Sequence, residues 1–138
     1  MLHSLTTAAV CAWALASAQP ALAQETLRVL TWPGYADADL VKAFELKTGS
    51  KVEVTTIDSD DVMWQKLNKN KAGDFDVFAV NTAELQRYIQ AGLAVPVQTA
   101  NIPNTARQLP RFRDLKGIPG LVHGNKVYAI PYTILKWA

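Results

Sequence analysis

Two large aromatic residues, Trp32 and Tyr35, flank a Pro33-Gly34 pair. Pro33 stiffens this stretch and Gly34 loosens it, which is typical of a turn. The rings of Trp and Tyr bind apolar stems along their faces and attract cations. This loop therefore favours an organic or amine-bearing ligand over a nucleotide. The alternative is purely structural, with Trp32 ending a strand in the core and Tyr35 covering the following helix.

Asn81 and Thr82 form a second candidate group, in the stretch Val80–Ala83. Either residue can cap the helix that follows. Their amide and hydroxyl can instead bind a ligand at the positive end of that helix. Both uses remain open from the sequence.

Asp58, Asp60 and Asp61 are a third candidate group, which could bind a cation or a metal. Acidic residues are also favoured in a helix's first turn by the helix dipole alone. From residue 24 onward there is no nucleophile–base pair, no metal-spaced His/Cys set and no Gly-rich phosphate motif, and the single histidine, His123, lies beside a predicted turn. We expect a binding protein and not an enzyme, with no catalytic residue, metal or cofactor.

Three strand–helix units place these groups. The predicted strands are 27–32, 51–57 and 75–80, and we expect the last to be covered on both faces. The first and third predicted helices are 37–47 and 82–90. The second helix lies between them, begins with Asp58 or Ser59 as its cap and is ended by Ala72-Gly73. The helices present apolar residues on one side, namely Leu40, Val41 and Phe44, then Met63 and Leu67, then Leu85, Tyr88 and Ile89. Asp37 and Gly49 are expected at the two ends of the first helix.

This alternation predicts an α/β fold, a three-layer sandwich lobe with a mostly parallel sheet, because parallel strands need crossover connections. Ligands bind such sheets at the carboxyl ends of the strands. The stretches 31–36, 57–61 and 80–83 are therefore expected at one edge. Further along, we expect a short strand over 93–97, a proline-interrupted connection, and a hairpin in which Gly124-Asn125 joins 121–123 to 126–131.

The composition indicates one globular domain without a nucleic-acid partner. The chain has 138 residues, of which 49% are hydrophobic and 19% charged, and its 14 Lys and Arg oppose 12 Asp and Glu without forming a basic stripe. We expect a monomer.

Residues 1–23 resemble a signal peptide. An apolar stretch from Ala8 to Ala18 is too short to span a membrane, and Ala21-x-Ala23 provides a cleavage site that starts the mature chain at Gln24. A frayed N-terminal helix is the alternative. The only cysteine, Cys11, lies in the apolar stretch, where it could instead carry a lipid. Cleavage would leave a mature chain, 24–138, without a thiol.

Several motifs in order resemble the first part of bacterial polyamine-class solute-binding proteins, which deliver spermidine, putrescine and related ligands to ABC importers. They are Leu27–Tyr35, Ala43-Phe44-Glu45, Thr48-Gly49, Lys51-Val52, Trp64–Leu67, Gly73–Val77, Gly92-Leu93 and Val127–Tyr132. The resemblance implies the first lobe of a two-lobed periplasmic-binding-protein (type II) fold, with a second lobe missing from this chain. It also implies a periplasmic location, a polyamine-like solute and ABC permease subunits of the inner membrane as partners.

The resemblance assigns Trp32 and Tyr35 to the aromatic pair that packs on the ligand's methylene chain, and Asn81 to a polar position that is usually Ser. Two positions depart from the pattern, since Gly34 replaces an acidic residue and Ala83 replaces an occasional aromatic. Two other functions stay open, an exported enzyme with catalytic residues elsewhere and a solitary sensor or interaction lobe. Neighbouring permease and ATPase genes would favour the importer over both.

Overall fold

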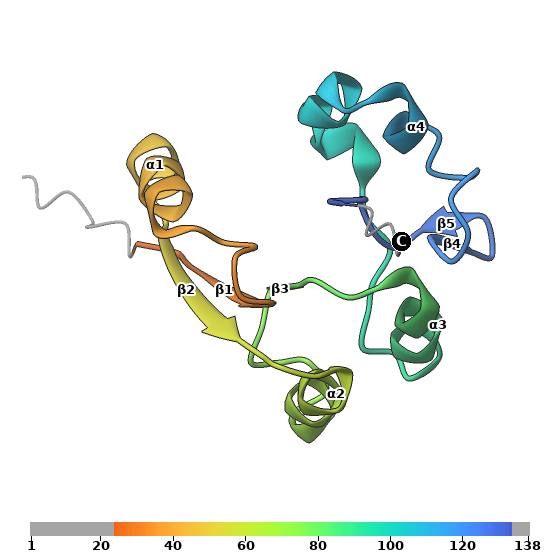
Figure 1. Cartoon of the computed structure of the whole chain (residues 1–138), viewed down its shortest axis with the longest axis horizontal. Coiled ribbons are helices and arrows are strands. Elements are labelled where there is room, and N and C mark those ends of the chain that lie inside the picture. The colour runs from red at the N-terminus through yellow and green to blue at the C-terminus, as the bar shows by residue number, and fades with distance from the viewer. Residues whose placement is uncertain (1–23, 134–138) are drawn as a thin grey trace, which may run out of the picture.

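A small parallel sheet forms the centre of the N-terminal half. The structure is a computed structural model that describes residues 24–133. The chain runs through β1 (Thr26–Thr31), α1 (Ala38–Thr48), β2 (Lys51–Thr56), α2 (Asp60–Lys69), β3 (Val77–Phe78) and α3 (Thr82–Gln90). The strands pair in parallel in the order β2-β1-β3, and α1 and α2 lie on opposite sides of this sheet (Figure 1). The α/β class and the parallel sheet are confirmed.

Local signals explain where the helices begin and end. Ser59 accepts a hydrogen bond from the backbone N–H of Val62 and so caps α2, whereas Asp37 stands at the start of α1 without a side-chain bond. Gly49 ends α1 at a φ of 75°. The prediction that α2 continues until Ala72-Gly73 ends it is wrong. The helix ends at Lys69, because the backbone turns left-handed over the next residues, with a φ of 60° at Ala72.

β3 is shorter than the predicted strand 75–80, although backbone bonds from Asp76 N–H to Arg28 C=O and from Ala79 N–H to Leu30 C=O extend its pairing with β1. Arg28 and Asp76 also form a bidentate ion pair, with Nη2–Oδ1 and Nε–Oδ2 distances of 2.8 and 3.0 Å. Hydrogen bonds from Arg28 lower the pKa of Asp76 from 3.8 to about 2. This pair explains why a charged residue lies in an otherwise apolar run.

The C-terminal half contains short elements. They are η1 (Thr99–Asn101), η2 (Pro103–Arg107), α4 (Pro110–Arg113), β4 (Val122–His123) and β5 (Lys126–Val127). The hairpin is confirmed, because β4 and β5 pair antiparallel around Gly124 and Asn125, which both have positive φ. The strand predicted over 93–97 is absent. Leu93 N–H bonds back to the Tyr88 carbonyl at the end of α3, and Val97 N–H bonds to the Val127 carbonyl. Neither bond continues into a ladder, and a strand needs a continuous partner.

α3 joins two groups of buried residues. The larger group contains Leu30, Ile57, Met63, Leu67, Tyr88 and Leu93, and the smaller contains Leu85, Ile89 and Leu121. Met63, Leu67, Leu85, Tyr88 and Ile89 are thus buried, as their helical spacing predicted. Since Tyr88 belongs to the first group and Leu85 and Ile89 to the second, α3 holds the sheet against the C-terminal half.

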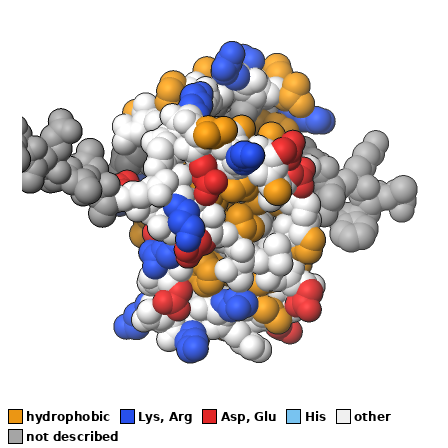
Figure 2. Space-filling model, turned by 90° about the vertical axis from the view of Figure 1, so that its left-hand side faces the viewer, with side chains coloured by type: hydrophobic (Ala, Val, Ile, Leu, Met, Phe, Trp, Pro, Cys, Tyr) orange, Lys and Arg blue, Asp and Glu red, His pale blue; other side chains and the backbone are white. Residues whose placement is uncertain are grey.

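The sheet face beneath α1 remains partly open. None of the α1 residues is buried, and Leu40, Phe44 and Val77 are 61%, 44% and 49% exposed. A groove of about 200 Å³ lies there, lined by Leu27, Val29, Ala36, Leu40, Val41, Phe44 and Val52. Figure 2 shows hydrophobic side chains gathered in the hollow of this side of the molecule. The prediction that the third strand is covered on both faces is therefore wrong at Val77. Among residues 24–133, no helix is long and apolar enough to cross a bilayer.

Candidate functional site at the carboxyl edge of the sheet

The three loops chosen from the sequence lie at one edge of the sheet. Thr31 pairs with Thr56 at the ends of β1 and β2, and Ala79 bonds to Leu30 at the end of β3. Because the strands are parallel, the loops that follow them leave from the same side. The predicted grouping of 31–36, 57–61 and 80–83 is thus confirmed.

Trp32 and Tyr35 are the two ends of a tight turn. The Tyr35 N–H donates to the Trp32 carbonyl at 3.2 Å, and Gly34 has a φ of 78°. Proline followed by a residue of positive φ is the pattern of a type II turn. A side chain at Gly34 would meet no atom within 4 Å, so backbone conformation and not space favours glycine there.

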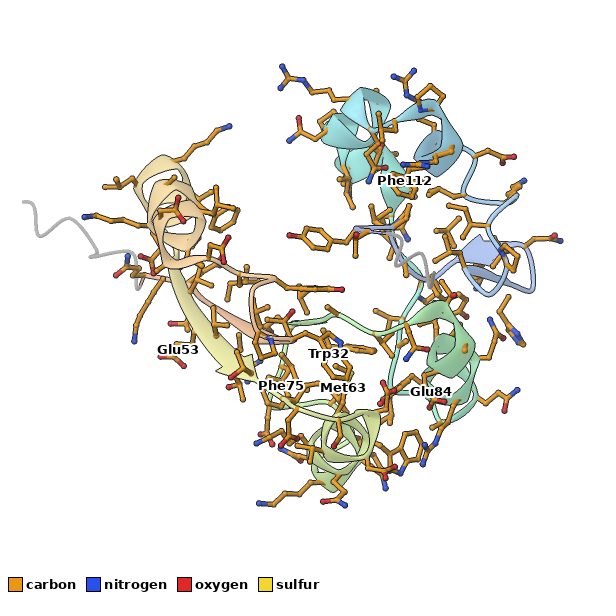
Figure 3. The ribbon with its side chains drawn as sticks, viewed as in Figure 1. Trp32, Glu53, Met63, Phe75, Glu84 and Phe112 are labelled. Carbon is orange, nitrogen blue, oxygen red and sulfur yellow. The ribbon has the colours of Figure 1, made fainter. Side chains whose placement is uncertain are left out.

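Trp32 is half-buried and packs against the larger core group. Its indole Nε1–H donates to the Ala79 carbonyl at 3.0 Å, which ties the first loop to the end of β3. Figure 3 shows Trp32 near the middle of the molecule, in the region between the sheet and α3. The side chain is neither fully in the core nor freely exposed, so both its structural role and a role at the ligand site are compatible with this geometry.

Tyr35 is half-buried and packs against Tyr132, with 5.0 Å between the ring centroids and 42° between the ring planes. The Tyr132 hydroxyl also lies 3.5 Å from the Tyr35 carbonyl oxygen. Tyr132 was absent from the site residues predicted from the sequence. The only available signal was its place at the end of the Val127–Tyr132 motif.

Asn81 caps α3 and also contacts the second loop. Its Oδ1 accepts from the Glu84 N–H at 3.0 Å, and its Nδ2 donates to both carboxylate oxygens of Asp60, at 3.1 and 3.2 Å. The capping interpretation is therefore confirmed. Both the oxygen and the nitrogen of the Asn81 amide are therefore engaged. A ligand at this position would either displace Asp60 from the Asn81 amide or bind the Asp60 carboxylate itself.

Thr82 is exposed in the first turn of α3, where its backbone carbonyl faces Gly120. A Cβ atom added at Gly120 would come within 2.7 Å of that oxygen. Asp60 and Asp61 are in the first turn of α2, as the dipole interpretation predicts. Within the part of the chain that the structure describes, no three His, Cys, Asp or Glu side chains are grouped so that they could hold a metal ion.

The part of the chain that contains these loops matches a known protein family. Residues 29–138 match the family described as bacterial extracellular solute-binding protein. The chain belongs to this family. The match begins inside β1 and includes every loop described above.

Solute-binding proteins named for polyamines are among its relatives. The putrescine-binding periplasmic protein PotF of Escherichia coli K12 is 32% identical over 109 residues, which are 79% of this chain and 28% of PotF. The spermidine/putrescine-binding periplasmic protein of Salmonella typhimurium LT2 is 27% identical over 84% of this chain and 32% of its own length. The chain thus spans about a third or less of these relatives.

A solved structure confirms the fold. The spermidine/putrescine ABC transporter substrate-binding protein PotD of Streptococcus pneumoniae superposes with a TM-score of 0.60 and 25% identity, over 70% of this chain and 30% of PotD. The resemblance found in the sequence motifs is therefore confirmed at the level of the family and of its α/β fold. The roles of Trp32, Tyr35, Asn81 and Thr82 toward a ligand stay predictions.

Proposed function

We propose that this chain forms one lobe of the extracytoplasmic solute-binding component of an ABC importer, which binds a polyamine or a similar small organic cation in a cleft between two lobes. The family match over residues 29–138, which includes the carboxyl edge of the sheet, is the observation that carries the proposal. The relatives named for putrescine and spermidine support the ligand class.

The chemistry of the edge suits such a ligand. Trp32 and Tyr35 offer aromatic faces for a methylene chain or an ammonium group. The Asp60 carboxylate adds negative charge at the same edge of the sheet, where it accepts from the Asn81 amide. Asn81 and Thr82 add polar groups at the start of α3.

This edge alone supplies too little free energy for tight binding. A micromolar site needs about 8 kcal/mol, whereas an exposed cation–π contact contributes about 0.5–1 kcal/mol. An ammonium group that leaves water also needs carboxylates to replace its hydration. We therefore expect most of the affinity to come from further polypeptide that encloses the ligand. Closure of the two lobes would then trap the solute and present the closed form to permease subunits in the inner membrane.

Isothermal titration of residues 24–138 with putrescine and spermidine tests the binding. We expect no saturation in the micromolar range and a weak response at millimolar concentration, with uncharged 1,4-butanediol as the matched control. Micromolar binding would show that this lobe already holds a complete site. Equal responses to the diamine and the diol would contradict the cation preference.

The periplasmic location is part of the same proposal, with cleavage after Ala23. The residues concerned, 1–23, lie outside the part of the chain that the structure describes. N-terminal sequencing of protein recovered from the periplasm should begin at Gln24. A start before Ala21, or a lipid on Cys11, would contradict the predicted processing.

A further inference from the structure

Tyr132 stands at the candidate site although 97 residues separate it from Tyr35. Its side chain is 64% exposed, so much of its surface remains available beyond the contact with Tyr35. Exposed aromatic rings that pack against another aromatic ring offer a continued apolar surface. At this edge, that surface extends the one offered by Tyr35.

The backbone beside Tyr132 is held in place. The Gln108 side chain donates from Nε2 to the Pro131 carbonyl at 2.8 Å, and Pro131 itself has a restricted φ. The residue before Tyr132 is thus tied to the segment between η2 and α4. A ring on such a support can fix the position of its neighbour, whereas a ring on a free end cannot.

The ring contact matters more than the hydroxyl. The distance of 3.5 Å from the Tyr132 hydroxyl to the Tyr35 carbonyl is far longer than the usual 2.7–2.8 Å of an O–H···O bond. The centroid distance of 5.0 Å lies well within the range of favourable aromatic pairs. The two interactions therefore make separable contributions, which a Phe variant and an Ala variant can distinguish.

We propose that Tyr132 is a positioning residue of the ligand site, which holds the Tyr35 ring at the carboxyl edge of the sheet and adds a second aromatic face for an alkylammonium ligand. The ligand class in this proposal rests on the proposed function, but the positioning of Tyr35 does not. Tyr132 would thus couple the end of the C-terminal half to the first loop of the sheet.

The test uses the protein purified after expression of the whole chain, as wild type and as Tyr132→Phe, Tyr132→Ala and the control Phe44→Ala. Phe44 is also an exposed aromatic residue, but it lies on the α1 groove. Nuclear Overhauser contacts between the Tyr35 ring and residues 31–34 of its own loop report the position of Tyr35, and titration with putrescine at millimolar concentration reports binding.

We expect Tyr132→Ala to weaken the contacts between the Tyr35 ring and residues 31–34, and to weaken putrescine binding by about twofold to fivefold, the range of one exposed cation–π contact. Tyr132→Phe should keep both properties near wild type, and Phe44→Ala should leave both unchanged. Unchanged contacts between the Tyr35 ring and residues 31–34 in Tyr132→Ala would overturn the positioning role. Unchanged affinity, in a wild type that binds, would overturn the second aromatic face.

The failure of the proposed function gives a different pattern. If the wild type shows no response to putrescine while Tyr132→Ala still displaces Tyr35, the polyamine class and the second face are overturned, but the positioning of Tyr35 is supported.

Discussion

Replacing Tyr88 with Phe should stabilise the protein. Tyr88 is 0% exposed, and its ring packs against Trp64 and Phe78 at centroid distances of 5.3 and 5.2 Å. Its buried hydroxyl has no hydrogen-bond partner among residues 24–133. A buried polar group without a partner costs about 1–3 kcal/mol. Because Tyr88→Phe keeps the ring and removes only this group, the free energy of unfolding should rise.

The loss of the hydroxyl oxygen has a small opposing cost. A void of about one probe sphere, ~10–15 Å³, costs about 0.3 kcal/mol at about 24 cal/mol per Å³. The expected net gain is therefore about 0.7–2.7 kcal/mol. For a domain of this size, each 1 kcal/mol raises the midpoint of thermal unfolding by about 4 °C.

Urea unfolding followed by far-UV circular dichroism measures this change, because Trp64 fluorescence is itself sensitive to the substitution. Tyr128→Phe, at a half-buried tyrosine of the smaller core group, is the matched control. A loss of more than about 0.5 kcal/mol in Tyr88→Phe would refute the reasoning, since it would show that the hydroxyl has a partner such as a bound water.

The same burial makes stability depend on alkaline pH. Burial and the nearby charge of Asp60 raise the pKa of Tyr88 from 10.0 to about 12. Between these values the unfolded chain loses this proton and the folded chain keeps it, so the free energy of unfolding should fall as pH rises from about 10 to about 12. Spectrophotometric titration should show a tyrosine step near pH 12 that is lost in Tyr88→Phe.

Four further substitutions test other parts of the structure. Gly34→Asp should lower the free energy of unfolding by about 1 kcal/mol, because of the positive φ, yet strengthen putrescine binding in an NMR titration; weaker binding would contradict the cation site. The free energy of unfolding of the wild type should fall as pH falls from about 4 to about 2, because the pKa of Asp76 is lower in the folded protein than in the unfolded chain. Asp76→Asn should flatten this dependence of urea stability on pH. Leu67→Ala should cost about 2–5 kcal/mol because Leu67 is fully buried, whereas Leu40→Ser, at a 61% exposed position, should stay within about 0.5 kcal/mol. If chemical denaturation shows that Leu40→Ser lowers the free energy of unfolding as much as Leu67→Ala does, α1 is packed more tightly than described.

Local chemistry made the helices predictable. Ser59 and Asn81 bond the backbone of their own first turns, and Gly49 takes a conformation that other residues rarely adopt. Each of these signals acts within four residues, so the sequence displays it directly. The bounds of α3, Thr82–Gln90, were predicted without error for this reason.

Pairing between distant segments was harder to predict. The run 93–97 has strand-like residues, but its only bond to another strand is the one between Val97 and Val127. The contact between Tyr35 and Tyr132 likewise depends on how the C-terminal half meets the sheet, which no periodicity reveals. Sequence patterns therefore located the loops of the candidate site but not the ring that packs against them.

The lack of buried residues in α1 has a consequence for motion. An isolated helix shorter than about 12–15 residues is marginal in water, and α1 has 11 residues, none of them buried. It should therefore open and close locally while α2 and α3, which hold Met63, Leu67 and Tyr88 in the core, remain folded. Amide hydrogens of α1 should exchange with solvent through this local opening, at rates that global stabilisation by Tyr88→Phe does not change, whereas those of α3 should slow. The free energy of opening would then differ within the molecule, with a lower value for α1 and a higher value for the core.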